Sequence, residues 1–183
     1  MIFGIVIGII LAIIVIMFIY YYNRLVTLSN EIDNSLSQID VQLKKRSDLV
    51  PNLLASVKGY MKHERAAISE VTNARKALVG AKTMESKVKA GNELGNALKS
   101  VFALAENYPD LKANTNFLHL QQELSAIEDK VAYARQFYND STLSYNNACT
   151  TFPGTFFAKL YNRKAKEFLK IAPAERAVPK VSF

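Results

Sequence analysis

Few side chains in this chain have the type and spacing that metal binding or catalysis requires. The two histidines, His63 and His119, fall on separate predicted helices, and neither belongs to an H-E-x-x-H or comparable ligand pattern. A protein metal site needs three or four convergent ligands. We therefore predict no metal site and expect both histidines to be solvated or to lie at helix ends.

Nucleophilic catalysis has equally little support. Cys149 is the single cysteine, and no histidine or basic residue close to it in the sequence would lower the pKa of its thiol. Glycine-rich phosphate loops and serine nucleophile elbows are absent, and Gly91 and Gly95 lie inside a helical pattern where close packing would explain them. We predict no catalytic residue, no cofactor and no enzyme activity, because no convergent chemical set is visible.

Arg46 occupies a predicted core position between Leu43 and Val50 on an apolar helical stripe. A buried guanidinium needs a carboxylate partner, and Glu128, beside the stripe of a later helix, is the best candidate for a buried ion pair. Alternatively, the stem of Arg46 packs against the core while its charged head reaches water. The sequence leaves both interpretations open, and we favour the second.

These residues must be positioned by helices, and the first helix begins with a membrane anchor. Residues 2–22 contain no charged side chain. A helix of this length, rising about 1.5 Å per residue, spans roughly 31 Å, which matches the hydrocarbon core of a bilayer. A cleaved signal would need a basic start and a small-residue cleavage site, and a lipoprotein signal would need a cysteine at the junction. The segment has none of these, so we expect a retained transmembrane anchor.

Two sets of residues in this anchor indicate membrane contacts. Three aromatic residues suited to the lipid–water interface close it, and the first charge follows them: Tyr20, Tyr21, Tyr22 and Arg24. Small residues spaced by four share one helix face, which allows close helix–helix approach in lipid: Gly4, Gly8 and Ala12. Chance spacing is the alternative for this second set.

The charge distribution indicates orientation and partners. Basic residues follow the anchor and none precedes it, which favours an N-terminus outside and a body in the cytoplasm. The net charge of +7 divides into +3 over residues 23–160 and +4 over residues 161–183. This basic tail fits anionic lipid or an acidic partner. Nucleic acid is not expected, because no recognition motif accompanies the charge.

The remaining chain predicts an all-α fold. Apolar residues at steps of three and four run from residue 25 to residue 57 and continue past Pro51, so the first helix should be continuous with the anchor and kinked by the proline. A second stretch starts near His63 or Glu64 and breaks between Gly80 and Thr83. A third ends at Pro109, after which Asp110 can cap the next helix.

The clearest heptad-like seam covers residues 117–148, and a short aromatic helix follows it at residues 156–161. We predict an up-and-down bundle of long antiparallel helices. Its domains are the anchor at 1–22, the bundle at 23–161, and a basic, partly irregular tail at 162–183. The absence of periodicity from Ala172 onward makes the tail irregular.

Several ordered blocks of the sequence resemble the LemA family. They are residues 22–26, 38–53 and 57–60, followed by residues 106–114, Phe117 and the pairs 134–135, 138–139, 145–146 and 152–153. The resemblance implies a bacterial inner-membrane protein with one N-terminal span and a long helical bundle. It supplies no catalytic residues. Some similar proteins neighbour HtpX-type membrane proteases in gene order, which implies an adaptor role as one possibility.

Two hypotheses for function follow. The first is a non-enzymatic membrane scaffold that forms homo-oligomers through its anchor and bundle. The second is a monomeric, membrane-tethered adaptor that presents its bundle or basic tail to another envelope protein, such as a membrane protease. The size of the protein in mild detergent distinguishes them, and the bilayer is a partner in both.

Overall fold

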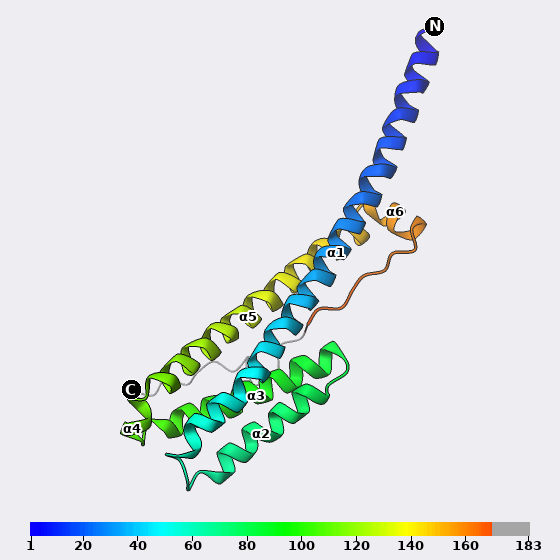
Figure 1. Ribbon diagram of the computed structural model, residues 1–183. Coiled ribbons are helices and arrows are strands. Elements are labelled where there is room, and N and C mark those ends of the chain that lie inside the picture. The colour runs from blue at the N-terminus through cyan, green and yellow to red at the C-terminus, as the bar shows by residue number, and fades with distance from the viewer. Residues whose placement is uncertain (170–183) are drawn as a thin grey trace, which may run out of the picture. The chain divides into compact units, whose positions relative to one another are not determined.

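The structure, a computed structural model, describes residues 1–169 of the 183-residue chain. Every regular element in that part is a helix (Figure 1): α1 Ile2–Lys58, α2 Arg65–Gly80, α3 Met84–Ala105, α4 Pro109–Lys112, α5 Thr115–Thr150 and α6 Gly154–Leu160. The chain forms two compact units, Met1–Asp33 with Phe137–Phe183, and Asn34–Gln136. Long helices α1 and α5 contribute to both units, and the predicted all-α bundle fold is confirmed.

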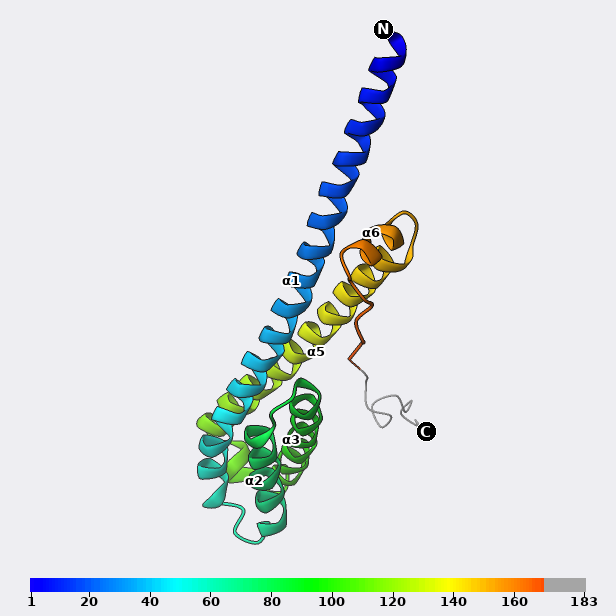
Figure 2. The same ribbon diagram turned by 90° about the vertical axis from the view of Figure 1, so that its right-hand side faces the viewer.

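The unit of residues 34–136 is a bundle of α2, α3, α4, the end of α1 and the start of α5. Figure 2 shows α2 and α3 lying side by side, and the three residues between them make them antiparallel. Its core is filled by the apolar stripes that the sequence predicts, including Ile39, Leu53, Val71, Leu94 and Val131. Burying such side chains contributes about 1.5–3 kcal/mol each relative to leaving them exposed.

Helix α1 continues through Pro51, as the apolar pattern predicts. A proline has no backbone N–H, so the carbonyl of Ser47, four residues earlier, loses its helical partner. Arg75 of α2 replaces that partner, because its Nε donates a hydrogen bond to the Ser47 carbonyl at 2.8 Å. The helix therefore tolerates the proline with the help of a neighbouring helix.

Short polar turns separate the other helices of this unit. Thr83 begins α3 with a capping box, in which its hydroxyl and Ser86 each accept from the other's backbone N–H. The expected cap at Asp110 is wrong. Pro109 opens the short helix α4 with Asp110 in its first turn, and the side chain of Asn114 caps α5 by accepting from the backbone N–H of Phe117.

The other unit contains residues 1–33 of α1, the last turns of α5, α6 and the irregular segment 161–169. Leu25, Leu28 and Ile32 of α1 are buried together with Tyr145 of α5 and Phe157 of α6. Gly154 makes the turn into α6 possible, since a Cβ at this position would lie 2.1 Å from the Ala148 carbonyl oxygen. The predicted irregularity from Ala172 onward lies outside the described residues.

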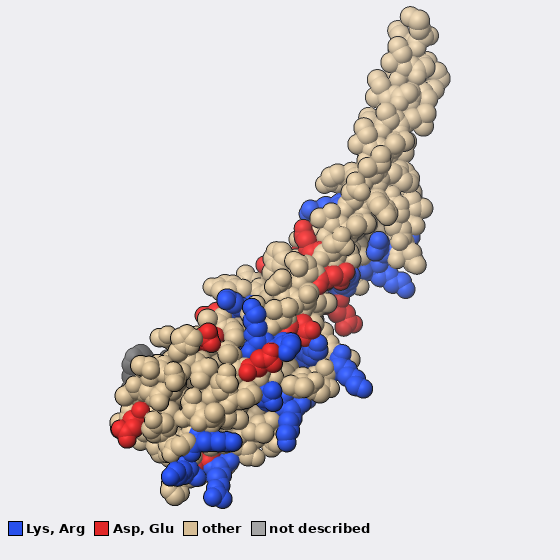
Figure 3. Space-filling model, in the orientation of Figure 1, with Lys and Arg blue, Asp and Glu red and all other residues tan. Residues whose placement is uncertain are grey.

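The start of α1 is long and apolar enough to cross a membrane, and it is the one such helix in the described part of the chain. Its side chains are exposed from Ile2 to Ile16. The visible face of this segment carries no Lys, Arg, Asp or Glu (Figure 3). A single apolar N-terminal helix indicates single-pass membrane anchoring.

Candidate functional site

The polar centre of the 34–136 unit is Arg46. Its side chain is only 3% exposed, and its Nη2 forms an ion pair with the carboxylate of Glu128 on α5, which is 46% exposed. Its Nη1 donates to the Gly91 carbonyl of α3 at 3.1 Å. The structure thus brings Arg46 and Glu128 together, and the interpretation that the arginine head reaches water is wrong.

Glycines on α3 create the space for this buried guanidinium. A Cβ on Gly95 would lie 3.3 Å from Arg46 Nη1 and 3.4 Å from Glu128 Oε2, which is tighter than most Cβ contacts. A Cβ on Gly91 would lie 2.6 Å from Leu43 Cδ2. The weak helix-forming tendency of both glycines is therefore offset by close packing, as the sequence predicts.

The electrostatics of this centre favour a structural role. Burial lowers the pKa of Arg46, and the charge of Glu128 opposes that change. The guanidinium nevertheless stays charged in a protein, so it cannot act as an acid or base. The arginine joins α1 to α3 and α5 through directional bonds.

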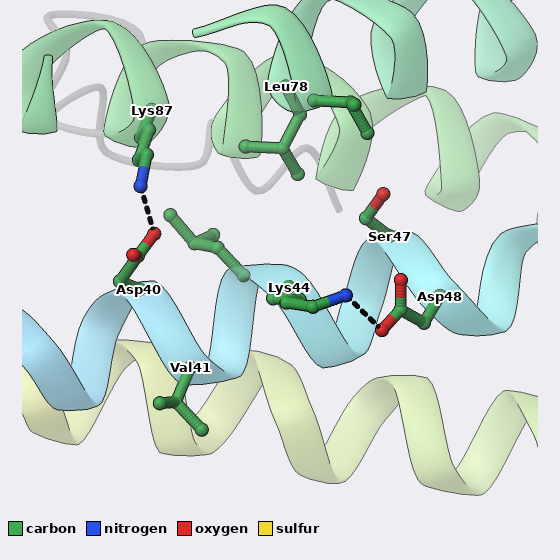
Figure 4. A pocket seen from close by; sticks show the side chains of 9 residues that line it. Asp40, Val41, Lys44, Ser47, Asp48, Leu78 and Lys87 are labelled. Carbon is green, nitrogen blue, oxygen red and sulfur yellow. Dashed lines mark hydrogen bonds and ion pairs between the residues drawn. The ribbon is translucent and has the colours of Figure 1, made fainter. Parts of the chain in front are cut away.

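A groove of about 340 Å³ lies in the same unit, between α1 and the α2–α3 pair. Two ion pairs lie at this groove (Figure 4): Lys87 Nζ of α3 lies 2.6 Å from Asp40 of α1, and Lys44 Nζ lies 2.8 Å from Asp48 on α1 itself. The hydroxyl of Ser47 is buried and has no hydrogen-bond partner among residues 1–169. No histidine lines the groove, and the amines and carboxylates that line it are ion-paired with one another.

A second polar arrangement, in the other unit, holds the irregular segment after α6 against α5. Asn146 accepts from the backbone N–H of Lys166 at 2.8 Å and donates to the carbonyl of the same residue at 2.9 Å. Asn139 makes the same two bonds with Leu169, at 3.0 and 3.3 Å. These amides bind main-chain groups, so they hold this segment independently of its side chains. We call residues 163–169 the strap.

The side chain of Lys166 adds a third attachment. Its Nζ lies 3.1 Å from Ser29 Oγ and 3.5 Å from Asp33 on α1, and 5.5 Å from the centre of the Tyr145 ring. A cation over an aromatic ring contributes about 0.5–1 kcal/mol at exposed sites. The positive charge of Lys166, which belongs to the basic tail, therefore contacts groups of α1 and α5 in the same chain.

The sequence interpretation did not assign roles to the asparagines or to Arg75. Their signal was present, because the pair Tyr138–Asn139 recurs seven residues later as Tyr145–Asn146, which places both asparagines on one helix face. For Arg75, the signal was the carbonyl that any mid-helix proline leaves open.

The predicted membrane residues lie on α1 of the same unit. Gly4, Gly8 and Ala12 are exposed, and a Cβ on either glycine would meet nothing within 4 Å. Tyr20, Tyr22 and Arg24 are exposed as well. Tyr21 is half-buried because its ring stacks on Phe157 of α6 at 4.7 Å between centroids. Two of the three tyrosines predicted to lie at the interface are thus exposed.

The isolated reactive residues do not assemble into a site. His63 and His119 are exposed, and residues 1–169 contain no group of three or more His, Cys, Asp and Glu side chains that could hold a metal ion. Cys149 is buried, and that burial raises its pKa, which disfavours the reactive thiolate. The polar side chains described above instead join helices to one another and hold the strap against α5.

The chain is similar in sequence to several known proteins. Magnetosome protein MamQ from Magnetospirillum gryphiswaldense is 25% identical over 179 residues, covering 84% of this chain and 66% of that protein. Magnetosome protein MamQ 2 from Paramagnetospirillum magneticum matches to the same extent. Protein LemA from Metamycoplasma hominis is 31% identical over 134 residues, covering 71% of this chain and 60% of that protein.

The chain spans slightly less than two thirds of the length of these relatives. The sequence model of the LemA family matches residues 35–183. This range includes Arg46, the strap, and the two asparagines that bind the strap, Asn139 and Asn146. With its single apolar N-terminal helix and all-α bundle, this chain is a membrane-anchored helical protein that belongs to the LemA family.

Proposed function

We propose that this protein is a non-enzymatic scaffold that self-associates at the bacterial inner membrane through its anchor. The observation that carries the proposal is the uncovered small-residue face of α1. Gly4 and Gly8 have open space around them, so the backbone of another helix can approach closely there. We propose with it that the chain divides into three parts: an anchor at 1–22, a bundle at 23–161 and a tail at 162–183.

The interior of the bundle supports a structural role. Its one deeply buried charged residue, within the described chain, is Arg46, and this side chain joins three helices. A packed helical bundle joined to a membrane anchor suits a protein that holds copies of itself, or other proteins, at the membrane.

Light scattering of the full-length protein in mild detergent tests self-association. We expect oligomers, and we expect Gly8→Leu to reduce their mass because a leucine separates the helix backbones. Val6→Phe is the matched control, since it adds bulk two residues away and therefore on the opposite side of the helix. A monomer at every concentration would rule out the scaffold.

The alternative is a membrane-tethered adaptor for another envelope protein such as a membrane protease. The groove favours it, because Val41 and Val79 are exposed beside paired charges and could receive a partner's side chains. A photo-crosslinker at Val79 should then give one discrete heteromeric product. The same crosslinker at exposed Leu118, which does not line the groove, should not.

We also propose an N-terminus outside and a cytoplasmic bundle. The exposed Lys130 provides a reporter position. In a Cys149→Ala background, Lys130→Cys should resist membrane-impermeant thiol reagents in intact cells and react after permeabilisation. Labelling of intact cells would reverse the orientation.

A further inference from the structure

The short helix α6 carries an exposed apolar face beside the end of the anchor. Phe156 and Leu160 are four residues apart and therefore share one side of the helix, and Phe152 lies in the turn just before it. All three are strongly exposed: Phe156 at 58%, Leu160 at 54% and Phe152 at 89%. A soluble surface rarely exposes three large apolar side chains together without a partner.

Contacts with α1 fix where this face lies along the anchor. Phe157 packs against Phe18 with 5.1 Å between ring centroids, and Tyr161 donates from its hydroxyl to the Phe18 carbonyl at 3.0 Å. The ring of Tyr161 also packs edge-on against Tyr22 at 5.4 Å. The segment from Phe18 to Tyr22 is the last turn of the uncharged stretch, so α6 lies at the depth where the anchor leaves the hydrocarbon.

The charges around α6 are of one sign. No Asp or Glu occurs between Asp140 and Glu167, whereas Lys159, Arg163 and Lys164 flank the apolar face. Along α1, Arg24 is the one charged residue before Glu31. A basic border around exposed Phe and Leu is the composition of a helix that lies in the interface of an anionic bilayer.

We infer that α6 is a second membrane contact, an interfacial foot whose Phe152, Phe156 and Leu160 enter the boundary between headgroups and acyl chains. Its basic residues meet anionic headgroups. This foot would fix the tilt and rotation of the anchor, since two contacts on one compact unit define an orientation that a single helix does not. The inference rests on the anchor spanning a membrane and does not require self-association.

The chain contains no tryptophan, so single-tryptophan variants report from one position each. The full-length Phe156→Trp variant would be reconstituted in vesicles of phosphatidylcholine and phosphatidylglycerol, at about three to one, with nitroxide-labelled lipid as the quencher. The matched control is Phe137→Trp, because Phe137 is 50% exposed on α5 in the same unit. Ile10→Trp reports separately on the anchor.

The fluorescence of the Phe156→Trp variant should be quenched several-fold more than that of the Phe137→Trp control, most strongly by a nitroxide near the headgroup end of the acyl chain. Replacing Lys159, Arg163 and Lys164 by Gln should reduce that quenching toward the level in pure phosphatidylcholine. Circular dichroism would check that each variant is folded. The foot would be overturned if the Phe156→Trp variant were quenched no more than the control, or if its emission were blue-shifted but insensitive to the labelled lipid.

The Ile10→Trp variant separates the two possible failures. If its tryptophan is quenched by deep nitroxides while that of the Phe156→Trp variant is not, the anchor spans the membrane and only the interfacial foot is wrong. If neither variant is quenched, membrane anchoring itself fails, and the foot fails with it.

Discussion

The side chain of Arg75 supplies the hydrogen-bond donor that Pro51 removes from α1. Its Nε donates to the carbonyl of Ser47 at 2.8 Å, and this carbonyl is the one whose helical partner the proline removes. The bond joins α2 to α1 within the 34–136 unit. The carbonyl that the proline leaves without a partner in α1 is therefore the group that a side chain of α2 binds.

Arg75→Leu should destabilise the bundle by about 1–2 kcal/mol, because it leaves a carbonyl without a partner. In a Pro51→Ala background the loss should be smaller, since the new N–H at residue 51 can donate to Ser47. Urea unfolding followed by circular dichroism measures both. Lys76→Leu, at the exposed neighbouring position, controls for the added leucine. Equal losses in the two backgrounds would contradict the proposed link.

Removing the partner of Arg46 should leave a buried charge without compensation. We expect Glu128→Ala to lower the free energy of unfolding by about 2 kcal/mol, less than for a fully buried pair because Glu128 is half-exposed. After Arg46→Met, which keeps an unbranched apolar stem but removes the guanidinium, Glu128→Ala should have little effect. The double-mutant cycle measures this coupling. Additive losses would show that the pair does not act as a unit.

The strap should be held less firmly when one of the two asparagines that bind its backbone is replaced. Asn146→Ala deletes two hydrogen bonds to Lys166, so the amide of Lys166 should exchange with deuterium many times faster. Helix α5 should stay folded, because its core residues are unchanged. Asn147→Ala is the control at the adjacent exposed position. Unchanged exchange at Lys166 would mean that the Asn146 side chain contributes nothing to holding the strap.

Cys149 should make the protein less stable in alkaline solution. Burial raises the pKa of its thiol, and burial together with the neighbouring Cys149 raises the pKa of Tyr145. The thiol is protonated in both the folded and the unfolded state below its ordinary pKa of about 8.5, so stability is unaffected there. Above it the unfolded state loses its proton first, and the free energy of unfolding falls as pH rises through the folded pKa.

Cys149→Ala should therefore flatten the stability curve above about pH 8.5, and unfolding at a series of pH values measures this. In the native protein the thiol should react slowly with iodoacetamide and become reactive in urea. An identical alkaline slope in the two proteins would show that the thiol is not responsible.

Much of the fold was predictable because a packed helix needs apolar residues at steps of three and four, and this spacing is visible in the sequence. The stripe from residue 25 to residue 57 predicts α1, and the seam over residues 117–148 predicts α5 to within a few residues at each end. The error at Asp110 has a local cause. A proline followed by an acidic residue fits both a helix end and the first turn of a short helix, and Pro109 opens α4.

The sequence by itself determined the helices, the apolar anchor segment and the absence of recognisable catalytic motifs, because these depend on side-chain type and spacing along one chain. Only the tertiary structure decided what the polar residues contact. It placed Arg46 between Gly91 and Glu128, Arg75 on the Ser47 carbonyl, and Tyr161 on the Phe18 carbonyl. Each contact joins residues far apart in sequence, and helical periodicity carries no information about which distant face will supply the partner.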